Sequence, residues 1–357
     1  MKQTGLNNLE MFIAKQIELN GSMPLGEFMS IAMTHPEYGY YTNSYPIGVD
    51  GDFITAPEIS QIFGEMIGAW IIDVWIQMGS PELNLIECGA GHGTLMADIM
   101  RVGEKVSEFA DLVNIYIIET QGNMRGKQKS NLRPYKVSWY ETINKIKADK
   151  PCIIIGNEFL DALPIEQLKR GNNGWQQRFV DFDGNVFKFI WKKADKFLLE
   201  FLPKKTLSNK IYEISKAQIG FIKKSSSLIE KSSGAALFID YGHNKSNYGE
   251  TLQAVKKHKY SDVLKNIGRS DITSHVDFAA LKRNIPSDII SPFIVTQRNF
   301  LLSLGIEHRA NALITSNADM EVSIKKQLER LISKDQMGDL FKVMCFYNCN
   351  IKPCGFS

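Results

Sequence analysis

Residues 83–94 read Leu-Asn-Leu-Ile-Glu-Cys-Gly-Ala-Gly-His-Gly-Thr, and this stretch decides the fold. Its first six residues form a short apolar run of the kind found in buried strands. Three glycines follow at alternate positions, where the absence of a Cβ lets the backbone turn sharply and approach a ligand closely. Thr94 then begins a helical pattern that runs to Arg101. The stretch predicts a strand, a glycine turn and a helix, which is the cofactor-binding unit of Rossmann-like sheets.

More short apolar runs lie on either side of helical segments further along the chain. These runs are residues 113–119, 137–140, 152–156 and 235–242, with residues 340–348 as a last strand. Strands that alternate with helices are typical of a parallel sheet covered by helices on both faces. We therefore expect an α/β protein built on a Rossmann-like sheet.

Two further regions stand apart from this alternation. Residues 7–34 have helical periodicity, residues 37–53 read as a loop, and residues 58–78 predict a long amphipathic helix. Residues 165–202 instead alternate with a period near two, and the turn signals GNNG and DFDG separate their runs. We interpret the first region as an N-terminal helical extension and the second as an inserted antiparallel β segment.

These patterns divide the chain into four parts with different expected roles. The parts are a helical extension with a pocket-covering loop (1–80), a cofactor-binding half (81–164), an inserted β and helical segment (165–230) and a second half of the sheet (231–357).

Composition narrows the class of protein. The chain has 357 residues, of which 44% are hydrophobic and 23% charged, as in ordinary globular proteins. A net charge of +3 is too small to indicate nucleic acid or a membrane surface as the main partner. No apolar run approaches the roughly 18 residues that a membrane span needs. The first 18 residues resemble neither a signal peptide nor an Arg-rich transit peptide, which favours a bacterial cytoplasm, although a mature mitochondrial chain would look the same.

The five cysteines are scattered and odd in number, which argues against a disulfide framework and for a reducing compartment. Cys345, Cys349 and Cys354 lie near one another but form no CxxC pair and have no nearby histidine. We therefore expect no metal site.

The glycine run predicts a cofactor of nucleoside type. Its spacing, G-x-G-x-G, differs from the G-x-G-x-x-G of dinucleotide sites, which place a pyrophosphate on a helix N-terminus. S-adenosylmethionine carries no phosphate and so fits this loop. Glu87 is placed to orient the loop or the cofactor amine, and Glu119, at the end of the next strand, to accept the ribose hydroxyls. The alternative is that both acids are only strand-end charges in water.

Residues 156–164, Gly-Asn-Glu-Phe-Leu-Asp-Ala-Leu-Pro, follow another predicted strand and are candidates for substrate binding. Paired carboxylates suit an amine or a guanidinium, and one helical turn would bring Glu158 and Asp161 together. In the alternative interpretation Asp161 caps a turn before Pro164, and only Glu158 faces the site. His243, after residues 235–242, is a weaker candidate for a base.

Several segments resemble the MidA-type family of class I methyltransferases. In chain order they are THPEYGYYT (34–42), GDFITAPEISQIFGE (51–65), IECGAGHGTLMADIMR (86–101), NEFLDALPIEQ (157–167), IDYGH (239–243), TLQAVKKHKY (251–260), DITSHVDFAAL (271–281) and MGDLFKV (337–343). They are similar to the family over nearly the whole chain. Family members include the mitochondrial protein-arginine methyltransferase that assists assembly of respiratory complex I.

The resemblance implies S-adenosylmethionine as methyl donor and symmetric dimethylation of an arginine, in a complex I subunit for the mitochondrial members. The resemblance and the residue patterns together indicate two sets of site residues. The cofactor set is Glu87, Gly89, Gly91, Gly93, Thr94, Glu119 and Gln61, and the catalytic set is Asn157, Glu158 and Asp161. Glu58 and Ser60 are further polar candidates in the segment that covers the pocket. Ala90 and His92 depart from the Pro and Arg that the family usually has, so a fixed cation is lost.

Three other functions compete with a protein-arginine methyltransferase. An assembly factor would bind a partner subunit and use the cofactor only as structural support. A methyltransferase for a small molecule would keep the same cofactor loop. A dehydrogenase is disfavoured by the glycine spacing. The intact glycine loop and the NEFLD segment favour catalysis.

Overall fold

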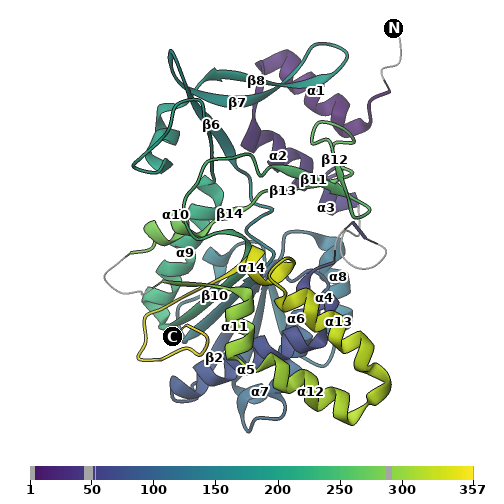
Figure 1. The fold of residues 1–357 in the computed structure, drawn as a ribbon, viewed down its shortest axis with the longest axis vertical. Helices are drawn as coiled ribbons and strands as arrows, with labels where there is room; N and C mark the ends of the chain where they lie inside the picture. The colour runs from purple at the N-terminus through teal and green to yellow at the C-terminus, as the bar shows by residue number, and fades with distance from the viewer. Residues whose placement is uncertain (1–4, 44–50, 53, 287–291, 357) are drawn as a thin grey trace. The chain divides into compact units, whose positions relative to one another are not determined.

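The computed structural model describes residues 5–43, 51–52, 54–286 and 292–356. The chain forms two compact units, each assembled from three stretches of sequence (Figure 1). Unit 1 consists of Met1–Phe53, Asp161–Gly220 and Lys245–Ala280. Unit 2 consists of Ile54–Leu160, Phe221–Asn244 and Leu281–Ser357.

Unit 2 is built on a sheet whose strands lie in the order β15-β16-β10-β5-β2-β3-β4. Their bounds are β2 Leu83–Cys88, β3 Val113–Ile118, β4 Val137–Tyr140, β5 Cys152–Asn157, β10 Gly234–His243, β15 Phe293–Thr296 and β16 Phe341–Tyr347. From β10 to β4 all neighbours are parallel, whereas β16 runs antiparallel to both β10 and β15. Every strand predicted from the sequence for this sheet is confirmed, and β15 is an additional one.

The chain order reverses at β2, because β3 and β4 lie on one side of it and β5 and β10 on the other. In open α/β sheets, ligands bind beyond the carboxyl ends of the strands at such a reversal. The segments that leave β2, β3 and β5 are therefore the expected binding edge of unit 2.

Helices cover both faces of this sheet (Figure 1). Successive side chains of a strand point to opposite faces, so Leu237 and Phe238 mark the two sides of β10. Leu237 belongs to the core under α5 (Gln61–Gln77) and α6 (Thr94–Gly103). Phe238 instead meets Phe221 of α9 (Lys216–Ser232), with ring centroids 5.8 Å apart. This three-layer arrangement confirms the predicted Rossmann-like class.

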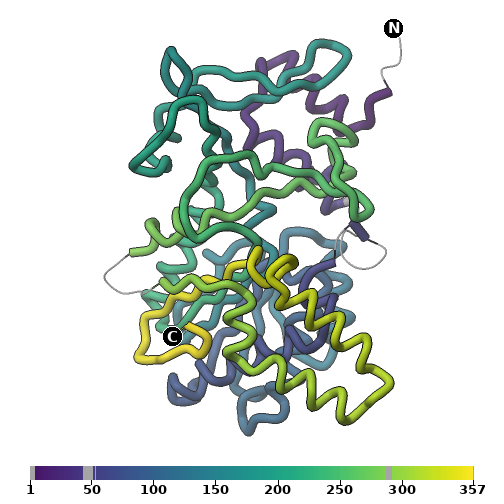
Figure 2. Tube along the Cα trace, viewed as in Figure 1, coloured from purple at the N-terminus to yellow at the C-terminus, as the bar shows by residue number. Residues whose placement is uncertain are grey.

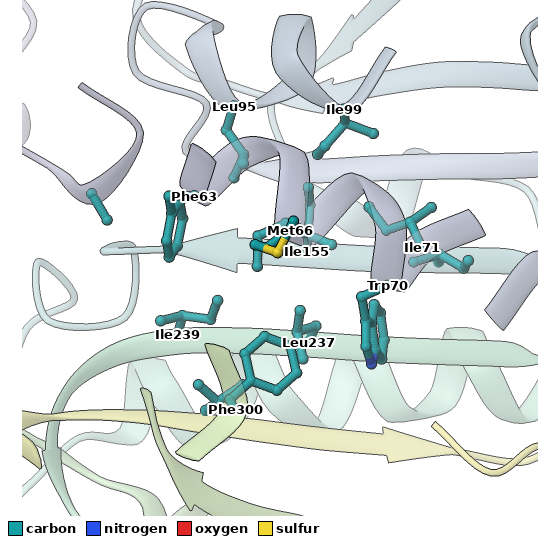
Figure 3. Close-up of a cluster of buried hydrophobic side chains, with 14 of the residues drawn as sticks. Phe63, Met66, Trp70, Ile71, Leu95, Ile99, Ile155, Leu237, Ile239 and Phe300 are labelled. Carbon is teal, nitrogen blue, oxygen red and sulfur yellow. The ribbon is translucent and has the colours of Figure 1, made fainter. Parts of the chain in front are cut away.

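The larger core of unit 2 fills the layer between α5 and the sheet (Figure 3). Its members include Phe63, Met66, Trp70 and Ile71 of α5, Leu95 and Ile99 of α6, Ile155, Leu237 and Ile239 of the sheet, and Phe300. Burying such apolar side chains is the main favourable contribution to the free energy of folding.

The predicted long helix over residues 58–78 is confirmed from Gln61 to Gln77, whereas its first three residues lie outside it. The structure has α4 (Ala56–Ile59) and then α5, with the extended residue Ser60 (φ −155°) between them. The Ser60 hydroxyl accepts a hydrogen bond from the Ile62 amide at 3.3 Å. A serine in this position satisfies an otherwise unpaired amide of the first turn, so a new helix begins at Gln61.

Further helices complete unit 2, and Figure 2 shows α12 passing beside α5. They are α7 Phe109–Leu112, α8 Gly122–Asn131, η1 Ile143–Lys145, α11 Gln297–Ser303, α12 Ile306–Ser316, η3 Ala318–Met320, α13 Glu321–Ile332 and α14 Met337–Leu340. Across the described part of the chain, no helix has the length and apolar character needed to cross a membrane.

Unit 1 combines N-terminal helices with antiparallel strands. One sheet has the order β1-β7-β6-β9 with β8 paired to β7, and a second has the order β12-β11-β13. The elements are α1 Asn8–Asn20, β1 Met23–Pro24, α2 Leu25–Thr34, α3 Tyr40–Asn43, β6 Glu166–Gly171, β7 Gly174–Phe182, β8 Phe187–Lys193, η2 Lys196–Phe201, β9 Ile211–Ile214, β11 Gln253–Lys256, β12 Lys259–Ser261, β13 Asp271–Thr273 and β14 Val276–Asp277. Helix α10 (Phe278–Arg283) begins in unit 1 and ends in unit 2.

The predicted antiparallel insertion is confirmed by β6, β7 and β8, whose turns fall at the GNNG and DFDG signals. The helical extension is confirmed by α1 and α2, which Gly21 separates with a positive φ of 82°. Part of the predicted loop over residues 37–53 forms α3, and residues 44–50 and 53 lie outside the described residues.

Two isoleucines of α5 provide a test of this packing. Ile71 is fully buried, whereas Ile76 is 54% exposed. We expect Ile71→Ala to lower the free energy of unfolding by about 2–5 kcal/mol, because it removes buried apolar atoms and leaves a cavity. Ile76→Ala should change it by no more than about 0.5 kcal/mol. Urea denaturation followed by circular dichroism measures both, and equal losses would contradict the placement of α5.

Candidate active site

The glycine loop after β2 has the backbone that its sequence requires. Gly89, Gly91 and Gly93 have φ values of 67°, 51° and 83°, in the left-handed region that side chains with a Cβ rarely adopt. A Cβ on Gly89 would also lie 2.7 Å from Cδ2 of Phe159. The loop thus runs close beside the segment that follows β5, and Gly93 leads directly into α6.

Glu58 of α4 contacts the end of this turn, where α6 begins. Its Oε1 accepts a hydrogen bond from the Thr94 hydroxyl at 2.7 Å and lies 3.4 Å from Nδ1 of His92. The contact with His92 is the largest influence on the pKa of Glu58, which is held below its ordinary value although burial opposes this. His92 stands where the family usually has Arg. The loop therefore still has a basic side chain next to Glu58.

Glu119, directly after β3, accepts hydrogen bonds on both carboxylate oxygens. Oε1 accepts from the Gln121 amide at 2.8 Å, and Oε2 accepts from Nε2 of Gln128 at 3.1 Å. Burial raises the pKa of this carboxyl above its ordinary value, while these hydrogen bonds oppose the shift. The acid therefore lies at the strand end with its orientation determined by α8.

Glu87, the penultimate residue of β2, is only 3% exposed. This burial contradicts the alternative that Glu87 is only a strand-end charge in water. Its Oε2 has no hydrogen-bond partner among the residues that the structure describes. Burial, and secondarily the charge of Asp98 on α6, raises the pKa of Glu87 to about 8. Asp98 itself is paired with Arg101, and burial raises its pKa to about 6.

Glu158 follows β5 in a strained conformation with φ 49°. Its amide donates to the Ile239 carbonyl at 2.9 Å. Its Oε1 accepts hydrogen bonds from the Ala56 amide at 2.8 Å and from Nδ2 of Asn157 at 3.0 Å. Non-glycine residues with positive φ cluster at functional sites, because surrounding contacts must hold them there. Here the side chain spans from the end of β5 to the start of α4.

Asn157 has a second feature of interest. Its Oδ1 is buried and has no hydrogen-bond partner within the described residues. Buried polar atoms are nearly always hydrogen-bonded in proteins, so an exception of this kind indicates a ligand or water contact.

Two residues that hold the site were not singled out as site residues from the sequence. Asp240 of β10 is fully buried, and its Oδ2 accepts from the amides of Phe159 at 3.1 Å and Leu160 at 2.9 Å. It thereby holds the turn that carries Glu158. Gln128 of α8 is also fully buried and donates to the Gly91 carbonyl at 2.9 Å. The only sequence signal for Asp240 was its position at a strand end, and Gln128 had none.

Asp161 and Gln61, two of the predicted site residues, make contacts with residues that were not predicted for the site. Asp161 belongs to unit 1, where it is buried and its carbonyl accepts from the Ser274 amide at 3.2 Å. Residues 158–163 form bends and turns, so the helical turn invoked to pair Glu158 with Asp161 is absent from this described segment. Gln61 is exposed at the start of α5 and donates to Oε1 of Glu65 at 2.9 Å.

The strand-end residues of unit 2 fit S-adenosylmethionine. This cofactor is cationic at its sulfonium and its amine and has no phosphate. Three carboxylates, Glu87, Glu119 and Glu158, belong to the ends of the three adjacent strands β2, β3 and β5. The Oε2 atom of Glu87 is buried without a hydrogen-bond partner among the described residues, and Glu87 lies two residues before Gly89 in the chain. A Cβ on Gly89 would fill the space next to Phe159.

No group of three or more His, Cys, Asp and Glu side chains is arranged to hold a metal ion in the described ranges. All five cysteines are free thiols.

The strand order, with antiparallel β16 between β10 and β15, and the glycine loop after β2 define a class I methyltransferase fold. Residues 66–288 match the family described as "Putative S-adenosyl-L-methionine-dependent methyltransferase". The chain belongs to this family. It is an S-adenosylmethionine-dependent methyltransferase, as the resemblance in the sequence implied.

Relatives support the same assignment over most of the chain. A Danio rerio protein named "Protein arginine methyltransferase NDUFAF7, mitochondrial" is 32% identical, covering 94% of this chain and 86% of its own. The Homo sapiens protein of that name is 30% identical, covering 91% of this chain and 80% of its own. A Burkholderia thailandensis protein solved with S-adenosyl-homocysteine has the same fold, with a TM-score of 0.82 at 23% identity, covering 98% of this chain and 92% of its own.

The backbone of Gly91 allows a direct test of the cofactor loop. We expect Gly91→Val to abolish saturable binding of S-adenosylmethionine in calorimetric titration, because a β-branched residue is strongly disfavoured at φ 51°. Gly126→Ala is the matched control, since Gly126 lies inside α8 with open space around a Cβ. The control should bind as the wild type does, and equal binding by the Gly91 variant would contradict the role of the loop.

The raised pKa of Glu87 predicts a pH-dependent stability. Between the ordinary pKa near 4.5 and the native value of about 8, the unfolded chain releases this proton and the native protein keeps it. The contribution of Glu87 to stability is therefore fully present below about pH 4.5 and is lost as the pH rises towards 8. We expect Glu87→Gln to gain in Tm relative to wild type between pH 5 and pH 8. A Tm difference that is constant with pH would contradict this.

Proposed function

We propose that this chain is a protein-arginine N-methyltransferase that forms symmetric dimethylarginine on a subunit of respiratory complex I. The observation that carries the proposal is the 32% identity over 94% of the chain to a protein named as a protein arginine methyltransferase. The complex I substrate and the symmetric product rest on the resemblance of the quoted segments. The carboxylate at the end of β5 supports a cationic substrate, because a guanidinium binds carboxylates through paired hydrogen bonds.

In this proposal the cofactor is held by the segments that leave β2 and β3. Gly89, Gly91, Gly93 and Thr94 form the loop against which it binds, and Gln61 is a polar contact from α5. Glu119 accepts the ribose hydroxyls, which suits a carboxylate already oriented by α8. Glu87 provides a buried oxygen acceptor for the amine, whose positive charge would favour the ionised form of a carboxyl that burial otherwise keeps protonated.

The cofactor would supply an electrophilic methyl group on its sulfonium, with S-adenosylhomocysteine as the leaving group when the S–CH3 bond breaks. Glu158 holds the substrate guanidinium so that one nitrogen points at this methyl, and positioning of this kind accounts for a large part of the rate in such transfers. Asn157 donates to Oε1 of Glu158 at 3.0 Å and so orients the carboxylate. The methylated nitrogen then gives up a proton. Asp161, three residues further along the chain, is the proposed acceptor, directly or through water.

The compartment and the division of the chain by role are also proposals. The relatives are named as mitochondrial, and for this chain we propose a cytoplasmic compartment. Five free thiols support a reducing compartment. We assign cofactor binding to residues 81–164, with residues 1–80 as extension and cover, residues 165–230 as insertion and residues 231–357 as the second half of the sheet.

Replacing Glu158 separates catalysis from cofactor binding. We expect Glu158→Gln to abolish methyl transfer, because a neutral amide binds a guanidinium weakly, and to leave the Kd for S-adenosylmethionine within a few fold. The amide oxygen can still accept from the Ala56 amide, so the fold should survive. The assay supplies radiolabelled S-adenosylmethionine and protein extract from cells lacking this chain, followed by amino-acid analysis for dimethylarginine.

Glu141→Gln is the control, because Glu141 is an exposed acid of unit 2 that pairs only locally with Lys145 at 3.0 Å. It should retain full activity. Turnover retained by Glu158→Gln would remove Glu158 from the mechanism. Label found by wild type on residues other than arginine would overturn the proposed substrate.

A further inference from the structure

Gln128 of α8 connects the two segments that the proposed function assigns to the cofactor. Its Nε2 donates hydrogen bonds to the Gly91 carbonyl at 2.9 Å and to Oε2 of Glu119 at 3.1 Å. Its Oε1 accepts a hydrogen bond from Nε1 of Trp139 on β4 at 2.9 Å. The side chain is fully buried, so water does not compete for these contacts.

These partners determine the orientation of the amide. A side-chain amide has two hydrogens to donate and an oxygen that accepts. Two of the partners, a carbonyl and a carboxylate, only accept, and the indole N–H only donates. Exchanging the nitrogen and oxygen of Gln128 would place an oxygen against two acceptors and a nitrogen against a donor. The network is therefore satisfied in one arrangement alone.

We propose that Gln128 is a positioning residue for the cofactor site. Its hydrogen bonds hold the glycine loop and Glu119 in fixed positions relative to each other. The inference rests on the proposed roles of the loop and of Glu119. A glutamine is suited to this task, because it contributes donors without a charge and so leaves the negative charge of Glu119 available to the ribose. A lysine or arginine at this position would form an ion pair with the acid instead.

A second contact from the same helix supports this role. Nδ2 of Asn131, three residues after Gln128, donates to the His92 carbonyl at 2.9 Å. The carbonyls of Gly91 and His92 are thus both bound by amide side chains of α8. Residues three apart lie on the same side of a helix, so α8 presents one face with two donors to the loop. A helix that only packed against the sheet would not need this polar face.

The test compares Gln128→Met, which keeps the volume and removes the hydrogen bonds, with wild type. The probe is S-adenosylhomocysteine, and the measurements are its Kd by calorimetry and the Tm without ligand. We expect the Kd to rise roughly 10- to 100-fold, the range for hydrogen bonds in which one partner is charged. The KM for S-adenosylmethionine should rise similarly, with kcat at saturating cofactor within about threefold of wild type.

Gln297→Met is the matched control for a purely structural effect. Gln297 is also a fully buried glutamine of unit 2, and its Nε2 donates to the Leu331 carbonyl at 2.9 Å. Its substitution should lower the Tm and leave the Kd unchanged. Equal Kd values for wild type and Gln128→Met would overturn the inference. So would a Kd that rises as much in the Gln297 control.

A double-mutant cycle of Gln128→Met with Glu119→Gln measures how far the effects of the two substitutions on the Kd depend on each other. If Gln128 acts partly through Glu119, Gln128→Met should cost at least threefold less affinity in the Glu119→Gln background than in wild type. An equal loss of affinity in both backgrounds would contradict the inference that Gln128 acts through Glu119. If Gln128→Met does not fold, Trp139→Phe removes the hydrogen bond that orients the amide while an aromatic ring stays at this position. About threefold weaker binding is then expected, and an unchanged Kd would overturn the inference.

The two proposals fail in different ways. No binding of S-adenosylhomocysteine by the wild-type protein would overturn the assigned cofactor site together with the role of Gln128. Binding by wild type that Gln128→Met leaves intact would overturn the role of Gln128 alone.

Discussion

The parallel pairing of β2 with β3 and with β5 is the constraint on which the site depends. In this register Cys88 lies opposite Ile118 on one side and Gly156 on the other. The chain therefore leaves all three strands at nearly the same level of the sheet. Gly89 and Glu119, which directly follow their strands, and Asn157, the last residue of β5, are far apart in sequence but lie at the same edge of the sheet for this reason.

The loops at this edge are held by polar contacts from neighbouring helices. The amides of α8 bind carbonyls of the glycine loop, and Glu58 of α4 contacts Thr94 and His92. Buried hydrogen bonds of this kind are costly to leave unmade, so they specify one geometry. His92 takes part in the same way, because its imidazole lies beside Glu58.

The site shows where local sequence information is sufficient. The glycines at 89, 91 and 93 could be interpreted from the sequence alone, because few residues other than glycine adopt a positive φ. Strands such as β2 and β4 were predicted to the residue, because each is a short apolar run bounded by polar or glycine residues. The break at Ser60 was missed, because serine inside an amphipathic pattern has the same appearance whether it caps a new helix or lies within an old one.

The sequence by itself determined the class of fold, the cofactor loop and the acids at the strand ends, since these depend on backbone conformation and on periodicity within a few residues. The tertiary structure alone decided what each acid meets. Glu87 is buried and its pKa is raised further by the charge of Asp98, Glu119 is bound by Gln128, and Glu158 by Ala56. The position of Asp240 at a strand end was readable from the sequence, but its hydrogen bonds and the whole role of Gln128 were not, because a hydrogen bond between residues that are distant in the chain leaves no pattern in either local sequence.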